Sequence, residues 1–89
     1  MYKPRFTNEF KKQLALMKKR GFKINLIENI MRELTHGNQL PPKNRDHFLV
    51  GEYVGCRECH IKPDWLLIYY YKDDEIIFVC TGSHSDLFD

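Results

Sequence analysis

With 89 residues, the chain is the size of one small domain, and we expect a single domain spanning residues 1–89. Its 43% hydrophobic and 29% charged residues are typical of a folded globular protein and exclude an intrinsically disordered one. The N-terminal segment is too charged for a signal peptide, and no apolar run reaches the roughly 18 residues of a membrane span, so we expect a cytoplasmic protein that binds no membrane.

The first half of the sequence predicts a short strand followed by two helices. The strand falls near residues 2–6 (YKPRF), where the proline restricts it to a sheet edge or a strand end. A helix follows over residues 8–20, with Thr7 or Asn8 as its N-cap, and apolar residues at helical spacing predict a second helix over residues 22–34. Lysines concentrate on the first helix, which suits either contact with a polyanion or an ordinary solvated surface.

The second half of the sequence predicts a sheet. Residues 38–46 (NQLPPKNRD) lack periodicity and form a loop, and the runs after it are rich in aromatic and β-branched residues: HFLVG, EYVGCRECHI, DWLLIYYYK and EIIFVCTG. DWLLIYYY is apolar at both its odd and its even positions, which point to opposite faces of a strand, and this predicts a central strand covered on both faces. The order of elements therefore predicts an α+β fold, in which the N-terminal strand and the two-helix hairpin pack on an antiparallel sheet of three to four strands.

The register of the last hairpin brings polar residues together. A two-residue turn at Asp73 and Asp74 and a second turn at Lys62 and Pro63 predict these pairs: Tyr69 with Phe78, Leu67 with Cys80, Trp65 with Gly82 and His60 with Trp65. His60, Trp65 and Cys80 then share one face, and His84 joins them if the strand continues. Asp64 lies at a turn, where side chains no longer alternate strictly between the two faces of the sheet. Two histidines and a carboxylate suit general acid–base chemistry, although each residue also has an ordinary structural role.

Cysteine spacing offers a zinc site as an alternative. Cys56 and Cys59, in a C-x-x-C pattern, would combine with Cys80 and His84 into a Cys₃His set. Cys56 and Cys59 are three residues apart, an odd number, so in an extended strand they point to opposite faces. Only a local turn between them could bring both thiolates to one ion. We therefore expect reduced thiols and no metal site.

The sequence resembles the RelE-type toxins of bacterial toxin–antitoxin pairs, most closely the YafQ branch. The resemblance covers nearly the whole chain and rests on DHFLVGEYVGCRECHIKPDWLLIYYY and on TGSHSDLF. It implies a RelE-like fold, similar to that of microbial RNases, and a small ribonuclease that cuts mRNA in the ribosomal A site. It also implies a cognate antitoxin that holds the toxin inactive, with a heterotetramer formed through the antitoxin's own dimer.

The resemblance assigns site residues by position: His47, His60, Asp64 and His84 as catalytic residues, with Trp65 and Phe88 near the substrate. The implied reaction needs no metal or other cofactor. The ribose 2′-OH attacks the adjacent phosphate, a base removes its proton, and an acid protonates the leaving 5′-oxygen. We expect His84 as the acid, His60 assisted by Asp64 as base or orienting residue, and His47 as a phosphate ligand or second proton carrier. Phe88 would stack on a base, for roughly 1–3 kcal/mol, or pack on its own core.

Position 80 departs from the family pattern. The YafQ branch has an arginine before the TGSH segment, where this sequence has Cys80, so the guanidinium expected at the scissile phosphate is missing. Its loss could slow cleavage roughly 10²- to 10⁴-fold. Arg57 or Lys62 could substitute for it, although the register places Arg57 opposite Tyr70, pointing away from Cys80. The alternatives are an attenuated enzyme, a substitution selected because it removes toxicity, and a catalytically silent protein that only binds the antitoxin or the ribosome.

Overall fold

The computed structural model of the chain describes residues 1–88. Its five-stranded sheet has the order β1-β5-β4-β3-β2, with β1 parallel to β5 and the other neighbours antiparallel. The strands are β1 (Lys3–Phe6), β2 (His47–Phe48), β3 (Arg57–Lys62), β4 (Trp65–Lys72) and β5 (Glu75–Gly82). The helices are α1 (Asn8–Lys19), α2 (Ile24–Thr35) and α3 (His84–Phe88), and two short 3-10 helices, η1 (Pro42–Asn44) and η2 (Gly51–Tyr53), lie in connections. Within residues 1–88, no helix is both long and apolar enough to cross a membrane.

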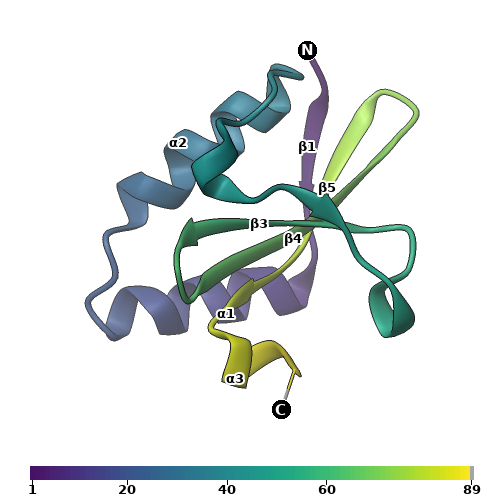
Figure 1. Cartoon of the computed structure of the whole chain (residues 1–89). Coiled ribbons are helices and arrows are strands. Elements are labelled where there is room, and N and C mark those ends of the chain that lie inside the picture. Colours follow the sequence, from purple (N-terminus) through teal and green to yellow (C-terminus); the bar gives the residue numbers. More distant parts are fainter. Residues whose placement is uncertain (89) are drawn as a thin grey trace.

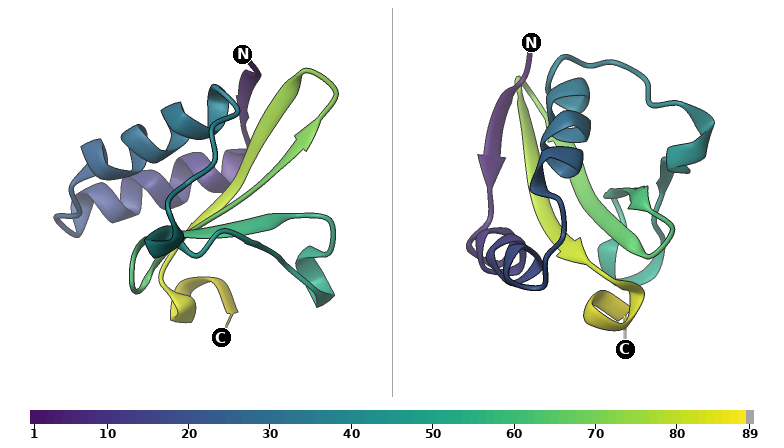
Figure 2. Two further views of the ribbon diagram at one scale, coloured as in Figure 1. Left: turned by 45° about the horizontal axis from the view of Figure 1, so that its top comes forward. Right: turned by 90° about the vertical axis from the view of Figure 1, so that its left-hand side faces the viewer.

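The α+β prediction is confirmed, because α1 and α2 lie side by side against one face of the sheet (Figure 1; Figure 2). The sheet is larger than predicted, since β1 joins one edge in parallel and β2 adds two residues at the other. Only the second half of EYVGCRECHI is a strand. Gly51 and Gly55 have φ of 79° and 91°, left-handed conformations that interrupt an extended chain, so residues before β3 form η2 and a turn.

Thr7 begins α1 and joins it to the sheet. Its hydroxyl oxygen accepts the Phe10 amide hydrogen at 2.9 Å, the usual N-cap bond, and the hydroxyl donates to the Val79 carbonyl at 2.7 Å. Of the two predicted caps, Thr7 is therefore the one used. This residue fixes the start of the helix layer against β5.

The core lies between the helix layer and the sheet. Its members come from the inner faces of α1 and α2, the segment before η1, and three strands: Phe10, Met17, Ile27, Leu34, Leu40, Cys59, Trp65, Leu67, Tyr69, Ile76 and Phe78. Residues 65–69 of β4 are all buried, whichever face they point to. This confirms that β4 is a central strand covered on both faces.

A β-bulge changes the register of the last hairpin. Next to the turn the pairing is as predicted, with Tyr69 opposite Phe78. Val79 then has no partner in β4, and Cys80 pairs with Ile68 rather than with Leu67. Because paired residues share a face, the bulge moves Cys80 from the helix-facing side of the sheet to the opposite side.

The turn between β3 and β4 also differs from the prediction by one residue. It is formed by Pro63 and Asp64, so Lys62 pairs with Trp65, and a second irregularity lets His60 pair with Leu66. His60 and Cys80 therefore share the face opposite the helices, whereas Trp65 points into the core. The predicted grouping of His60 with Cys80 is confirmed, and the inclusion of Trp65 is wrong.

Candidate active site

Histidines form a row on the sheet face opposite the helix layer. His47 on β2 shares this face with its partner on β3, and His60 lies two residues further along β3. The ring centroids of His47 and His60 are 6.5 Å apart, those of His60 and His84 are 5.9 Å apart, and that of Phe88 is 6.2 Å from His84. The structure thus brings together four of the residues that the sequence predicts for the site.

The row contains a carboxylate that the sequence analysis missed. Glu58 is only 4% exposed, and its Oε1 lies 3.5 Å from Nε2 of both His47 and His60. A buried carboxylate requires polar partners, and these two imidazoles face it. The spacing of Glu58 and His60 could have revealed it, because residues two apart in a strand point to the same side.

Backbone carbonyls fix the tautomers of two histidines. His47 Nδ1 lies 2.6 Å from the Arg45 carbonyl oxygen, and His60 Nδ1 lies 3.2 Å from the Pro63 carbonyl oxygen. A carbonyl only accepts, so each Nδ1 must carry the hydrogen and donate it. In both histidines Nε2 is therefore the nitrogen without a carbonyl partner, and in both it faces Glu58.

His84 begins α3 and is held by Asp64 in the β3–β4 turn. Asp64 Oδ1 accepts the His84 backbone N–H and the His84 Nδ1–H, each at 2.9 Å. These bonds, the backbone bond foremost, lower the pKa of Asp64. His84 Nε2 makes no hydrogen bond within residues 1–88, and 56% of the side chain is exposed. An exposed imidazole oriented by a carboxylate suits a general acid.

Two expectations about these residues need correction. Asp64 binds His84 and not His60, whose ring faces Glu58 and the Pro63 carbonyl instead. His84 reaches the site through the first turn of α3 and not through a continuing strand, because β5 ends at Gly82. The bulge in β5 explains the first error, because with Leu66 opposite Gly82 the register of β4 and β5 continues to place Asp64 opposite His84.

Cys80 lies beneath Tyr53 at one end of the row. It is 5% exposed, and its Sγ is 3.7 Å from the Tyr53 hydroxyl oxygen. Burial raises the pKa of the Cys80 thiol, and the contact with Cys80, followed by burial, raises the pKa of Tyr53 to about 12. Both groups are therefore neutral near pH 7. Tyr53 also packs edge to face on Phe88, with ring centroids 5.9 Å apart, so this end of the row is aromatic and uncharged.

Trp65 lies in the core rather than in the site. Its ring is 1% exposed, packs edge to face on Phe22 and donates its Nε1–H to the Thr81 hydroxyl oxygen at 3.0 Å. A ring enclosed in this way offers no free face to a base. The predicted substrate contact is therefore wrong, and Trp65 supports the site from beneath.

Arg57 is not available to replace an arginine at position 80. Arg57 pairs with Tyr69 and not with Tyr70 as predicted, because the pairing of β3 with β4 shifts between His60 and Lys62, and on this helix-facing side it still points away from Cys80. Its Nε donates to Asp46 at 2.9 Å, and its guanidinium lies 4.2 Å from the centre of the Phe48 ring. Lys62, by contrast, is exposed at the end of β3 and forms no ion pair within residues 1–88.

The alternative zinc set is not assembled. Cys59 is enclosed in the core, whereas Cys80 lies on the opposite face of the sheet, as its pairing with Ile68 shows. In the part of the chain that the structure describes, no three histidine, cysteine, aspartate or glutamate side chains are arranged to hold a metal ion. All three cysteines are free thiols.

Comparison with known proteins identifies this arrangement. Residues 2–89 match the family described as the bacterial toxin of type II toxin–antitoxin systems, YafQ. The mRNA interferase toxin YafQ of Escherichia coli strain K12 is 34% identical over 84 residues, which cover 93% of this chain and 91% of the relative. The structure of the E. coli DinJ–YafQ complex matches with a TM-score of 0.91 at 32% identity, and a metal-bound toxin from Helicobacter pylori matches with a TM-score of 0.92 at 38% identity. The first match covers 100% of both chains, and the second covers 99% of this chain and 100% of that one.

A sheet covered by two helices on one face is thus the fold that this chain shares with toxins of type II toxin–antitoxin systems. The chain belongs to the YafQ family of these toxins. The resemblance inferred from the sequence, and the RelE-like fold that it implied, are confirmed.

Proposed function

We propose that the protein is an endoribonuclease toxin that cleaves mRNA on the ribosome by metal-independent acid–base chemistry. The observation that carries this proposal is the Asp64–His84 pair, which fixes one imidazole with its Nε2 toward solvent at the end of a row of histidines. The E. coli relative that carries the name mRNA interferase toxin supports the choice of substrate. As a ribosome-dependent enzyme, the protein would act in the cytoplasm.

The proposed reaction uses two neighbouring histidines of the row, His60 as the base and His84 as the acid. His60 Nε2, beside Glu58, removes the proton of the ribose 2′-OH, and the 2′-oxygen attacks the adjacent phosphorus. The bond to the leaving 5′-oxygen then breaks, and His84 Nε2 donates its proton to that oxygen. The products are a 2′,3′-cyclic phosphate and a 5′-OH. His47 faces the same carboxylate as His60 and contributes to phosphate binding, while Phe88 stacks on a base.

We also propose that residue 80 weakens this reaction. Cys80 is neutral and lies under Tyr53, so it supplies no positive charge to the phosphoryl oxygens. The loss of such a charge slows phosphoryl transfer by roughly 10²- to 10⁴-fold. The same observation favours a second function, in which the protein is catalytically silent and acts only by binding an antitoxin or the ribosome.

A cognate antitoxin is the proposed protein partner. The match to YafQ within the DinJ–YafQ complex supports it, because the fold is the same over the whole chain. We expect the antitoxin to neutralise the toxin by direct binding and to form a heterotetramer through its own dimer.

Induced expression with primer-extension mapping of mRNA tests both functions. Four chains are compared: the natural chain, His84→Ala, Cys80→Arg, and Cys80→Arg combined with His84→Ala. We expect slow cleavage and partial growth arrest by the natural chain, loss of both in His84→Ala, and faster cleavage in Cys80→Arg that is abolished by the second change.

Each outcome distinguishes the candidates. Cleavage that appears only after Cys80→Arg would identify the natural chain as a binding protein. Cleavage that survives His84→Ala in either background would remove His84 from the mechanism. Silence of all four chains, with each variant shown to be folded by circular dichroism, would refute the nuclease proposal.

A further inference from the structure

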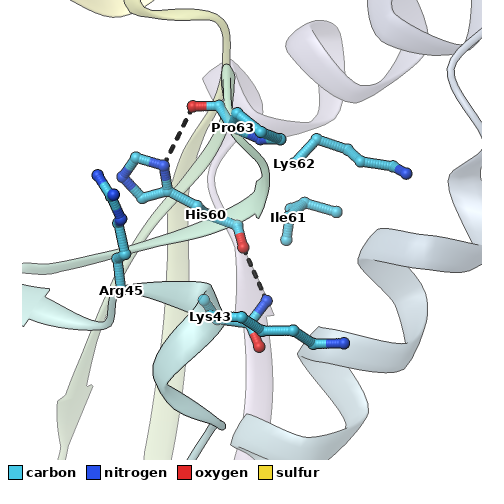
Figure 3. A pocket seen from close by; sticks show the side chains of 7 residues that line it. Lys43, Arg45, His60, Ile61, Lys62 and Pro63 are labelled. Carbon is cyan, nitrogen blue, oxygen red and sulfur yellow. Dashed lines mark hydrogen bonds between the residues drawn. The ribbon is translucent and has the colours of Figure 1, made fainter.

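A basic pocket of about 570 Å³ lies beside His60, between η1 and the β3–β4 turn. Three of its lining residues, Lys43, Arg45 and Lys62, are cations, and none is acidic. Arg45 extends alongside the His60 ring, whereas Lys43 and Lys62 extend in the opposite direction, away from Arg45 (Figure 3). The pocket is of a size that holds a small ligand and is contiguous with the proposed site through the shared histidine.

These three cations form no ion pair within residues 1–88. Of the other four arginines, Arg5, Arg20 and Arg57 each contact a carboxylate, and Arg32 donates to the Asn29 side chain. Like charges gathered around one pocket repel each other, and a bound anion relieves that repulsion. The composition of the pocket is therefore that of an anion site.

The backbone holds these cations next to the histidine row. Asn44, which is 5% exposed, donates its side-chain N–H to the His60 carbonyl oxygen at 2.8 Å and so ties η1 to β3. Arg45 has φ 48° and ψ 45°, a left-handed conformation that residues other than glycine rarely adopt. In this conformation its carbonyl oxygen accepts from His47 Nδ1 while its side chain lines the pocket. One strained residue thus orients a site histidine and presents a guanidinium beside another.

We propose that this pocket binds a backbone phosphate of the RNA strand, adjacent to the phosphate that is cleaved. Arg45 is the main contact, because a guanidinium can donate two parallel hydrogen bonds to a phosphate, and Lys43 and Lys62 add charge. The proposal rests on the proposed function and extends it by defining the path of the strand past His60. It also supplies positive charge near the reacting centre of a chain whose residue 80 is neutral.

The test measures binding separately from cleavage. The probe is a fluorescent single-stranded RNA with 2′-O-methyl groups, which lack the attacking hydroxyl, and affinity is measured by anisotropy over a range of salt concentrations. The pocket variant is Lys43→Gln/Arg45→Gln/Lys62→Gln. The matched control removes one arginine and two lysines from the exposed surfaces of α1 and α2: Lys12→Gln/Lys19→Gln/Arg32→Gln. We expect the pocket variant to lose affinity by about tenfold or more, and its salt slope to fall by about 0.7, whereas the control changes little.

Arg45→Gly is a second variant that separates binding from folding. Glycine adopts the left-handed conformation without strain, so this change keeps the carbonyl that orients His47 and removes the whole arginine side chain. We expect unchanged or higher thermal stability together with weaker RNA binding. Unchanged binding in Arg45→Gly would overturn the role of Arg45.

The remaining outcomes judge the subsite and the reaction independently. Equal loss of affinity in the pocket and control variants, or no binding of the RNA by the natural chain, would overturn the subsite. Displacement of the RNA by millimolar inorganic phosphate at constant ionic strength would mark a free-phosphate site and overturn the assignment to RNA. A natural chain that binds RNA through the pocket but cleaves none would support the subsite and refute the proposed reaction.

Discussion

Among the single residues of the site, Glu58 has the most restricted surroundings. It is buried, and one of its carboxylate oxygens faces Nε2 of both His47 and His60. The Nδ1 atoms of these histidines contact carbonyl oxygens, so Glu58 is the group that both Nε2 atoms face. A change in the charge of Glu58 therefore acts on both histidines at once.

Glu58→Gln tests this arrangement. Glutamine preserves the size of the side chain and removes its charge, so we expect the fold to persist and cleavage to fall by about 10²-fold, the lower range for loss of acid–base assistance. Cleavage of RNA is measured for the variant and for Glu52→Gln, a control that removes an exposed carboxylate from η2. Equal activity of Glu58→Gln and the natural chain would show that Glu58 has only a structural role on this face of the sheet.

At the level of elements, α3 depends on carboxylates. Asp64 Oδ1 accepts the His84 amide hydrogen, and Asp86 Oδ2 accepts the Ser83 amide hydrogen and contacts Arg20 Nη1, each at 2.9 Å. The pKa of each aspartate is lowered, that of Asp64 mainly by His84 and that of Asp86 first by the Ser83 backbone and then by Arg20. A carboxylate whose pKa is lower in the folded state stabilises that state above its unfolded pKa, about 3.9 for aspartate. This contribution is lost as the pH falls through the lower, folded value.

We therefore expect acid to release α3 before the rest of the chain unfolds. In ¹H–¹⁵N NMR spectra recorded from pH 7 downward, the amides of Ser83 and His84 should shift below about pH 4, ahead of the core amides. Asp64→Asn/Asp86→Asn should show part of this change already at pH 7. Ser83 and His84 signals that stay unchanged until global unfolding would contradict the role of the carboxylates.

The hairpin shows how far local reasoning from the sequence extends. The turn residues and the alternation predict the pairing near Asp73 correctly, as the contact of Tyr69 with Phe78 shows. The bulge at Val79 could not be predicted, because its carbonyl is satisfied by Thr7, a residue more than seventy positions away. The same bulge sets the partner of Asp64, because it brings His84 rather than Ser83 opposite Asp64, and the bond between Asp64 and His84 was therefore not predicted.

In the whole molecule, Thr81 links both layers. Its hydroxyl oxygen accepts the Trp65 Nε1–H and its hydroxyl donates to the Leu66 carbonyl, while its amide N–H donates to the Gln13 side chain of α1 at 2.9 Å. The residue is 1% exposed, so water cannot replace these partners. The buried hydroxyl therefore joins β5 to β4, and the backbone N–H of the same residue joins β5 to α1.

Thr81→Val should destabilise the protein without changing the site. Valine has nearly the same shape, but it leaves the Trp65 N–H and the Leu66 carbonyl unpaired, at a cost of about 1–3 kcal/mol. For a domain of this size each kcal/mol corresponds to a fall in Tm of about 4–8 °C. Calorimetry or urea titration measures the effect, with Thr81→Ser as the control that keeps the hydroxyl. Identical stability of the valine variant and the natural chain would contradict this account.

A mutation of residue 84 affects the two bonds between His84 and Asp64 differently. The imidazole bond is lost with the side chain, but the bond from the peptide N–H is available to every amino acid except proline. A single codon change at position 84 can therefore remove the proposed proton donor while the C-terminal helix stays anchored. Under the proposed function, one such change would end cleavage in a single step and still leave a protein with the same surface, so that inactive copies would compete with active ones for an antitoxin.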